Sequence, residues 1–318
     1  MPDTQFGNNY QPKLKIMKKS NLIYCTLLLA IIASSKINAQ EFYVRGGLGW
    51  ITESGKTEFN NADPNGLTGI TQSTDITVNP DGSTRVKSLS GTLGGGFKGN
   101  VTFGYMFNPY IGAELGFNYF DGDKRTIGKL NSPDLQSQAT AYLRGLDVMP
   151  AVYLTPAFPK LNPYARIGLL IPAAGKLHIE SIANASDAAG PGTDIHVEAE
   201  TEVESRFSVG FAGALGVTYP IGKKLHVFGE VEFKNLSIKS KSAEIQKYET
   251  LAINRATGAS VLVPGQQLDD LPRNEKEFQF EDSYTESDDP NAPRKIPTQY
   301  VNVGGIGINV GIRYSFGK

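Results

Sequence analysis

Few residues in this 318-residue chain are suited to catalysis or metal binding. The sequence has three histidines, one cysteine and four methionines, which argues against a metal-cluster protein, a disulfide-stapled scaffold or a thiol-based redox enzyme. Two short motifs, His178-x-Glu180 and His196-x-Glu198, could face each other across a hairpin and offer two imidazoles and two carboxylates to zinc. Exposed strand extensions often carry such residues, so we expect no metal and no cofactor.

Catalytic motifs give no better candidate. The segments from Gly168 to Lys176 and from Gly216 to Lys223 imitate a phosphate-binding loop. Neither has the required four-residue gap or a Ser or Thr after the lysine, and both lie on predicted strands. We therefore expect that the protein is not an enzyme. The net charge of −1 and the pI near 6.3 likewise give no sign of nucleic-acid binding.

The charges that could form a site lie in segments where apolar and polar residues alternate. In the last segment, six apolar residues at the even positions from Ile306 to Phe316 alternate without exception with small or polar residues at the odd positions from Gly305 to Ser315. A period of two excludes an amphipathic helix, whose apolar positions recur every three or four residues. The segment therefore predicts a β-strand.

Seven further segments alternate in the same way, and together they predict eight antiparallel strands. Turn signals such as Asn108-Pro109 separate several of them. The predicted strands cover residues 42–50, 97–107, 111–119, 146–154, 165–171, 207–217, 225–233 and 306–316.

The polar face of these strands distinguishes a membrane barrel from a soluble one. It consists mainly of glycine, alanine and serine with isolated charges, which suits a narrow, packed interior. The mean hydropathy of −0.25 and the charged fraction of 20 % exclude a bundle of membrane helices. A transmembrane β-barrel is not excluded, because its apolar residues alternate with polar ones.

The connections support the membrane barrel. Short turns alternate with long polar stretches at residues 52–94, 121–136, 184–203 and 247–298, as in barrels that have short periplasmic turns and long outside loops. Aromatic residues cluster where strands would meet the two membrane interfaces. These are Tyr105, Phe107, Tyr110, Tyr314 and Phe316 at one end, and Trp50, Tyr119 and Phe207 at the other.

The N-terminal region indicates export. Residues 17–39 have a basic start at Lys18 and Lys19, an apolar run of about twelve residues and a small residue at the expected cleavage point, as in a secretory signal peptide. Residues 1–16 are interpreted as a misassigned upstream extension, and residues 40–318 as the barrel. The single cysteine, Cys25, lies in the apolar run, so the mature chain would contain none.

This combination resembles the small outer-membrane β-barrel family of Gram-negative bacteria, the OmpA/OmpX-type and porin-family barrels, in the barrel domain alone. The resemblance implies an eight-stranded, antiparallel, up-and-down transmembrane barrel with long extracellular loops, located in the outer membrane. It also implies that the final aromatic residue, Phe316, helps to present the chain to the barrel-assembly machinery during insertion. Outer-membrane lipid is the other expected partner, and we expect a monomer.

The candidate site consists of charged residues at the strand positions that are predicted to point into the barrel. The predicted network comprises Arg45, Lys98, Glu114, Asp147, Arg166, Glu230, Glu232 and Arg313, and Lys234 also lies at an inward-facing position. Because an unpaired charge in a narrow lumen is costly, we expect ion pairs. Lys98 with Glu114, and Arg45 or Arg313 with Glu230, are the expected partners. A self-satisfied plug is favoured over a charge gate, because eight strands leave room only for side chains.

Two of the long polar stretches lead to further predictions. Residues 70–88 hold Asn79-Pro80-Asp81-Gly82 and predict a hairpin above the membrane. Residues 247–298 are rich in Asp and Glu, which is typical of a solvated, mobile loop, with divalent-cation binding as the less favoured alternative.

The predicted function is that of an envelope structural or surface-interaction protein with a side-chain-filled lumen, in which the loops recognise an extracellular ligand. The alternatives are a narrow porin for ions or small hydrophobic solutes and, least favoured, a lipid-modifying barrel enzyme. The enzyme would need an outward His near the outer leaflet, whereas His226 follows a turn at the opposite end and points inward.

Overall fold

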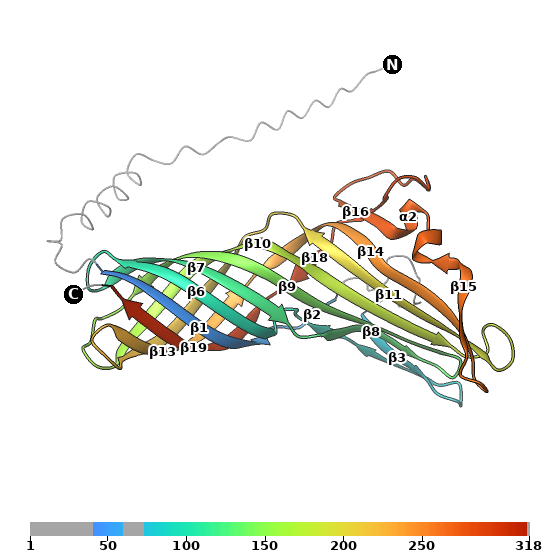
Figure 1. Ribbon diagram of the computed structural model, residues 1–318, viewed down its shortest axis with the longest axis horizontal. Helices are drawn as coiled ribbons and strands as arrows, with labels where there is room; N and C mark the ends of the chain where they lie inside the picture. Colours follow the sequence, from blue (N-terminus) through green and yellow to red (C-terminus); the bar gives the residue numbers. More distant parts are fainter. Residues whose placement is uncertain (1–40, 60–72, 317–318) are drawn as a thin grey trace, which may run out of the picture. The chain divides into compact units, whose positions relative to one another are not determined.

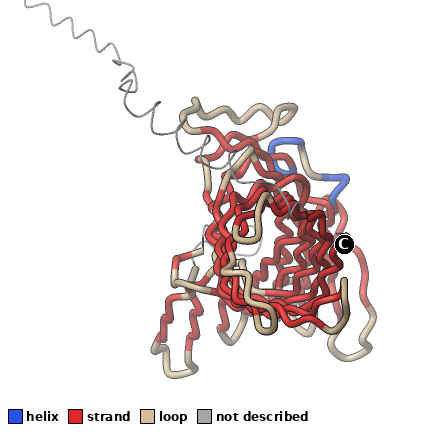
Figure 2. Tube along the Cα trace, turned by 90° about the vertical axis from the view of Figure 1, so that its left-hand side faces the viewer, coloured by secondary structure: helices blue, strands red, loops and turns tan. Residues whose placement is uncertain are grey.

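Eight strands close into an antiparallel barrel (Figures 1 and 2). The computed structural model describes residues 41–59 and 73–316, so the predicted signal peptide and the upstream extension lie outside the described residues. The barrel strands are β1 (Glu41–Glu53), β6 (Gly96–Met106), β7 (Ile111–Gly122), β9 (Leu135–Leu154), β10 (Asn162–Ala185), β12 (Gly210–Pro220), β13 (Leu225–Asn235) and β19 (Gly305–Ser315).

The barrel is closed by pairing between its first and last strands. Each barrel strand pairs with its neighbour in the order β1, β6, β7, β9, β10, β12, β13 and β19. Strand β19 then returns to β1, with Leu48 opposite Val310. Closure pairs the barrel strands on both sides, apart from residues 171–176 of β10, and so satisfies most backbone groups of the barrel wall. The eight-stranded fold is therefore as predicted.

Short turns connect the strands at one end of the barrel. In the turn between β6 and β7, Asn108 Oδ1 accepts hydrogen bonds from the backbone N–H groups of Tyr110 (2.8 Å) and Ile111 (2.9 Å). The side chain thereby satisfies two donors that the tight turn leaves without a ladder partner.

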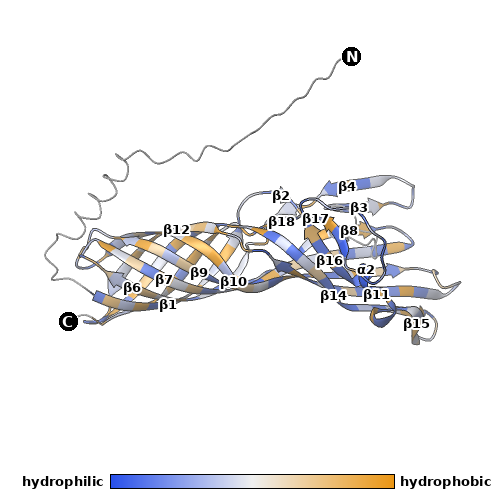
Figure 3. Ribbon diagram, turned by 90° about the horizontal axis from the view of Figure 1, so that it is seen from above, coloured by the Kyte–Doolittle hydropathy of each residue, from blue (hydrophilic) through white to orange (hydrophobic). Residues whose placement is uncertain are grey.

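The two faces of the barrel wall have opposite character, as the sequence predicts. Apolar residues project outward and are exposed, for example Leu215 (70 % exposed) and Ile308 (64 %). The predicted aromatic residues Trp50, Tyr119 and Phe207 also lie on the outside. Figure 3 shows apolar residues along the barrel strands. The inward residues are glycine, small residues and buried charges.

Several barrel strands continue beyond the barrel, where they pair with further strands of the same sheet. We call the end of the barrel away from the short turns its upper end. There β9 pairs with β8 (Arg125–Asn131), and β10 pairs with β11 (Thr193–Ser205). Strand β11 in turn pairs with β14 (Ser237–Asn254). We call this continuation the extension (Figure 1). The 24-residue length of β10 is more than twice the 9–11 residues that cross a membrane.

Smaller elements complete the extension, and the predicted hairpin at 70–88 is confirmed as β3 and β4. Among the described residues, no helix is long and apolar enough to cross a membrane. The smaller elements are β2 (Thr57–Glu58), β3 (Thr74–Val78), β4 (Thr84–Ser88), β5 (Ser90–Gly91), β15 (Ser260–Gln267), the 3-10 helix η1 (Leu268–Asp270), α2 (Arg273–Lys276), β16 (Glu277–Glu281), β17 (Arg294–Pro297) and β18 (Tyr300–Asn302).

The long polar stretches at 121–136, 184–203 and 247–298 connect the barrel strands as predicted, but much of each is strand and not irregular loop. The physical reason is a hydrophobic core inside the extension. Phe278 and Phe280 of β16 are 1 % and 2 % exposed and pack with Leu177 and Ile245. Burial of these large side chains organises the acidic 247–298 stretch, which was expected to be a solvated loop.

Candidate functional site

The centre of the barrel interior is the carboxylate of Glu230 on β13. Arg45 of β1 donates from Nη2 to Glu230 Oε2 at 2.6 Å, and Arg166 of β10 donates from Nη1 to Oε1 at 2.9 Å. The hydroxyl of Tyr164 and the side-chain amide of Asn309 also donate to Glu230, at 2.7 and 3.0 Å. Four groups from three strands, β1, β10 and β19, therefore converge on one carboxylate.

Glu114 of β7 pairs with the same two arginines. Arg166 Nε lies 2.6 Å from Glu114 Oε2, and Arg45 Nη1 lies 3.6 Å from Oε1. The hydroxyl of Tyr43 donates to Glu114 Oε1 at 2.7 Å. Arg45 and Arg166 are thus held between two carboxylates on opposite sides of the interior.

A third carboxylate extends the network. Lys98 Nζ of β6 donates to both oxygens of Glu232, at 2.6 and 2.7 Å. Asn309 Nδ2 donates to Glu232 at 2.9 Å as well as to Glu230, so it joins the two clusters. We call these six charges the interior network, which comprises Arg45, Lys98, Glu114, Arg166, Glu230 and Glu232.

The interior network is charge-balanced and dry, with three cations facing three anions. Arg45 is 2 % exposed and Glu230 is 4 % exposed. A single unpaired charge at this depth would carry a desolvation cost of several kcal/mol. Mutual pairing with added hydrogen bonds offsets that cost, so the arrangement stabilises itself as a unit.

Two predicted members lie outside the interior network. Asp147 of β9 accepts a hydrogen bond from Asn118 Nδ2 at 2.5 Å. Arg313 of β19 stacks its guanidinium over the ring of Tyr43 at 3.6 Å and approaches Glu41 at 3.6 Å. Of the eight predicted charged residues, six therefore form the interior network. Asp147 lies beyond one end of this network and Arg313 beyond the other.

Aromatic side chains close the interior below the interior network. The buried cluster consists of Tyr43, Met106, Tyr153, Tyr164 and Phe228. Glycine makes room for these rings, because a Cβ at Gly104 would lie 2.1 Å from Tyr43 Cζ. The small residues on the inward parity are thus required by the bulk of their neighbours across the lumen.

The predicted pairings are partly correct. Arg45 pairs with Glu230 as expected, but Lys98 pairs with Glu232 and not with Glu114. In the register between β6 and β7, Lys98 lies opposite Phe120 and Glu114 lies opposite Gly104. Six residues along a strand span about 20 Å, too far for contact. The hydrogen-bonding residues Tyr43, Tyr164 and Asn309 were missed, although their inward parity was a usable signal.

The two histidine motifs do not converge. His178 lies opposite Glu202 and His196 lies opposite Asn184. In the parts of the chain that the structure describes, no group of three or more His, Cys, Asp or Glu side chains is placed to hold a metal. Glu198 instead accepts a hydrogen bond from Lys247 and contacts His196, and these interactions hold the pKa of its carboxyl below the usual value.

Phe316 follows the end of β19 and is exposed. Its backbone N–H donates to the carbonyl of Phe42 at 2.8 Å, and its ring meets Tyr314 edge to face. The aromatic side chain is therefore accessible at the end of the barrel where the short turns lie. Its role in assembly stays a prediction from the resemblance.

A family model describing the outer membrane protein beta-barrel domain matches residues 23–255. The chain belongs to this outer-membrane barrel family. Membership places the protein in the outer membrane, with the apolar outside of the barrel in contact with lipid and both ends in water. No curated protein sequence matches the chain.

Solved structures of outer-membrane proteins are similar to this member of the family. OprG from Pseudomonas aeruginosa is 16 % identical, with a TM-score of 0.36 over 88 % of this chain and 97 % of that one. Ail, the attachment invasion locus protein of Yersinia pestis, is 9 % identical, with a TM-score of 0.27 over 87 % and 97 %. CarO of Acinetobacter baumannii is 15 % identical, with a TM-score of 0.27 over 69 % and 92 %.

Proposed function

We propose that the protein is a non-catalytic surface protein in which a plugged barrel anchors an ordered extracellular sheet. The observation that carries the proposal is the pairing of a filled lumen with an extension that has its own hydrophobic core. The lumen provides mechanical stability, and the extension presents a shaped surface outside the cell. Outer-membrane lipid surrounds the monomeric barrel, and the assembly machinery inserts it with help from Phe316.

The interior supports a plug over an axial pore. Ions would have to pass Arg45, which contacts both Glu114 and Glu230 across the lumen, and then the aromatic cluster below it. Opening such a path would break buried ion pairs, each at a cost of several kcal/mol. A plug explains both the charge balance and the dryness of the interior.

The outer face of the extension supports the recognition role. Strand β11 directs His196, Glu198, Glu200, Glu202 and Glu204 to one face, and partners on adjacent strands include Lys176, Lys241 and Lys247. The opposite face is buried in the hydrophobic core. A stiff, charged sheet face is well suited to bind a soluble or cell-surface ligand, because little conformational entropy is lost on binding.

Planar-bilayer recording tests the plug. Purified protein is expected to give no stable openings, and the Glu230→Gln variant is expected to give brief openings because Arg45 and Arg166 then lose one of their two shared carboxylates. Heat-modifiable migration on a gel provides the folding control. Stable openings of the wild-type protein, altered by the substitution, would instead establish the narrow porin.

A binding assay tests the recognition role. Cells that display the protein are compared on surfaces coated with cationic, anionic and uncharged polymers, with a variant carrying Glu198→Gln, Glu200→Gln and Glu202→Gln. Preferential adhesion that the triple variant loses supports recognition through this face. The matched control carries Asp81→Asn, Asp269→Asn and Asp270→Asn, outside β11. Equal adhesion of all variants to every surface contradicts the role.

A further inference from the structure

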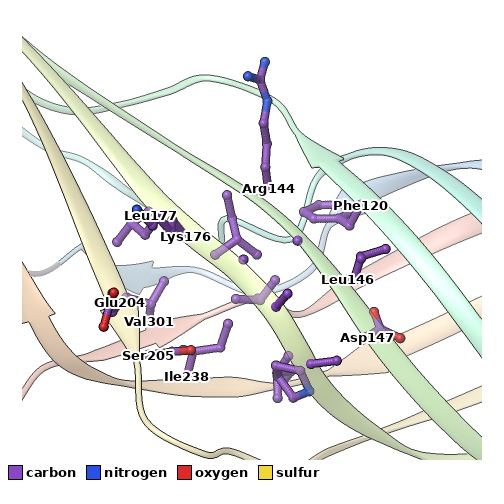
Figure 4. Close-up of a pocket in the computed structure, with 18 of the residues that line it drawn as sticks. Phe120, Arg144, Leu146, Asp147, Lys176, Leu177, Glu204, Ser205, Ile238 and Val301 are labelled. Atoms are coloured by element: carbon purple, nitrogen blue, oxygen red, sulfur yellow. The ribbon is translucent and has the colours of Figure 1, made fainter. Parts of the chain in front are cut away.

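A cavity of about 280 Å³ lies where the barrel meets the extension (Figure 4). It sits behind an interruption in the wall. Strand β10 pairs with β12 as far as Leu170 opposite Gly210, and it pairs with β11 from Leu177 opposite Val203. Between these points, residues 171–176 of β10 have no ladder partner on that side. The cavity therefore has a side opening at the upper edge of the barrel.

The cavity runs from exposed residues to buried ones. Its rim includes Lys176, Glu204 and the exposed ring of Phe207. Its interior is largely apolar and includes the buried side chains of Leu170 and Leu236. Figure 4 shows Asp147 at one end of the cavity and Glu204 at the other. The size and lining suit a short apolar chain or a small ring.

The inner end of the cavity holds a lysine with unused hydrogen-bonding capacity. Lys234 lines the cavity, is 6 % exposed and places Nζ 3.6 Å from the centroid of the Phe120 ring. Among the described residues, Nζ makes no ion pair and donates no hydrogen bond. This differs from Lys98, the other buried lysine of the interior, whose Nζ binds both oxygens of Glu232.

The carboxylate at the end of the cavity opposite Glu204, that of Asp147, is already partnered. Asp147 accepts the short hydrogen bond from Asn118. The capacity left unused is therefore that of a donor with a positive charge, because an ammonium has three donors and no acceptor. The ring of Phe120 attracts the cation but supplies no acceptor oxygen. A complementary ligand has an anionic oxygen at its head and an apolar body behind it.

We propose that this cavity binds a small anionic amphiphile, with its carboxylate on Lys234 and its apolar chain between β10 and β11. A medium-chain carboxylate has the required chemistry. It can enter from water as the free acid or from the outer leaflet, since the opening lies beside the outward ring of Phe207. The site goes beyond the proposed surface role, because it does not depend on recognition by the extension or on conduction through the lumen.

Calorimetric titration of octanoate into protein held in phosphatidylcholine nanodiscs tests the proposal, with empty nanodiscs as the blank. Wild-type protein is expected to bind octanoate more tightly than octanol or octylamine. Lys234→Met is expected to weaken octanoate binding about 10- to 100-fold, as for loss of a charged hydrogen bond, and to leave octanol binding within about twofold. Lys176→Met, at the exposed rim, is the matched control and should bind octanoate like the wild type.

A second variant keeps the test valid if Lys234→Met does not fold. Ser205→Trp places a large ring at the opening and retains Lys234, so it is expected to abolish binding of both octanoate and octanol. Heat-modifiable migration verifies that each variant is folded. Titration with nanodiscs that contain phosphatidylglycerol distinguishes the sources, since competition by the lipid would indicate entry from the leaflet. No heat above the blank, unchanged octanoate binding in folded Lys234→Met or Ser205→Trp, or tighter binding of octylamine would each overturn the proposal.

Discussion

Strand β10 crosses two environments with one sequence pattern. In the barrel, its odd-numbered residues Ile167 and Leu169 point outward and are 65 % and 52 % exposed. In the extension, its odd-numbered residues Leu177 and Ile179 pack in the hydrophobic core. The change occurs at an irregularity between Pro172 and Ala174, where β10 gains a residue relative to β9.

The comparison shows how a chain adapts one alternation to two solvents. A bulge adds one residue and turns every following side chain to the other face. Below the bulge, apolar residues meet lipid and charges face inward. Above it, apolar residues face inward, and Lys176 and Glu180 meet water. The barrel therefore has apolar residues outside and charged residues inside, whereas the extension has the reverse arrangement.

Removing a buried charge gives the largest expected effect in this comparison. Glu230→Gln is expected to destabilise the barrel by about 3–5 kcal/mol, because Arg45 and Arg166 remain buried with one carboxylate fewer. The exposed counterpart in the extension, Glu204→Gln, is expected to cost about 0–1 kcal/mol, since Lys241 stays solvated. Urea unfolding in lipid vesicles, followed by the loss of heat-modifiable migration, measures both. Equal effects would show that the interior network is not dry.

Truncating the core of the extension should separate the two regions. Phe278→Ala is expected to cost about 3–5 kcal/mol locally, because the ring is fully buried. Limited proteolysis should then cut the extension and leave a folded, membrane-protected barrel. Val261→Ala, which removes an exposed side chain from β15, is the control. Loss of the barrel along with the extension would show that the two regions fold as one unit.

Introducing a charged residue on the outer surface tests whether a position faces lipid or water, provided that the two positions compared are about equally exposed. Leu215 of β12 and Val261 of β15 are 70 % and 66 % exposed. Leu215→Lys is expected to cost up to about 2–4 kcal/mol, as for a cation within the lipid-facing band of a barrel, whereas Val261→Lys should cost less than about 0.5 kcal/mol. Urea unfolding in vesicles compares them. A negligible cost at Leu215 would contradict the lipid-facing assignment.

Acidification is expected to give the smallest effect, and only in the extension. Hydrogen bonds from Lys247 to Glu198 and from Lys241 to Glu204 lower the pKa of each carboxyl. A lowered folded-state pKa contributes stability above the unfolded value, and this stability is lost as pH falls through the folded value. Protease sensitivity of the extension should therefore rise below about pH 4.5, a typical carboxyl range. Unchanged sensitivity down to pH 2 would exclude a role for these pairs.

The sequence was sufficient to predict the barrel, because lipid and a packed lumen impose a strict alternation on every strand. Ile306 through Phe316 show this most clearly. The extension was missed because its inward residues, such as Ala139, Ala141 and Ala199, are small and its outward residues are charged. In the sequence such a pattern looks like that of a polar loop. Only the structure shows that the two phenylalanines of β16 cover small residues such as Ala139 and Ala141.

The sequence predicted which charged residues point into the barrel better than it predicted which of them form ion pairs with each other. Parity alone placed Arg45, Glu114 and Glu230 on the inward face. Partners across a lumen depend on the registers of several strand pairs at once, and one of these registers separates Lys98 from Glu114. Pro172 and Gly175 mark the bulge in β10 in the sequence. Neither shows that β10 changes its partner from β12 to β11 there, so the opening could not be predicted from sequence.

Site-directed spin labelling of β19 tests the central claim most directly, with single cysteines placed in turn at residues 305–312 of protein in lipid vesicles. Collision with oxygen, which concentrates in lipid, is expected to be high at Ile306, Ile308, Val310 and Ile312 and low at the alternating positions, while a water-soluble nickel complex should reach none of them. High nickel accessibility at the even positions, or the loss of the two-residue period, would contradict a barrel that faces lipid with its apolar residues and encloses its charges.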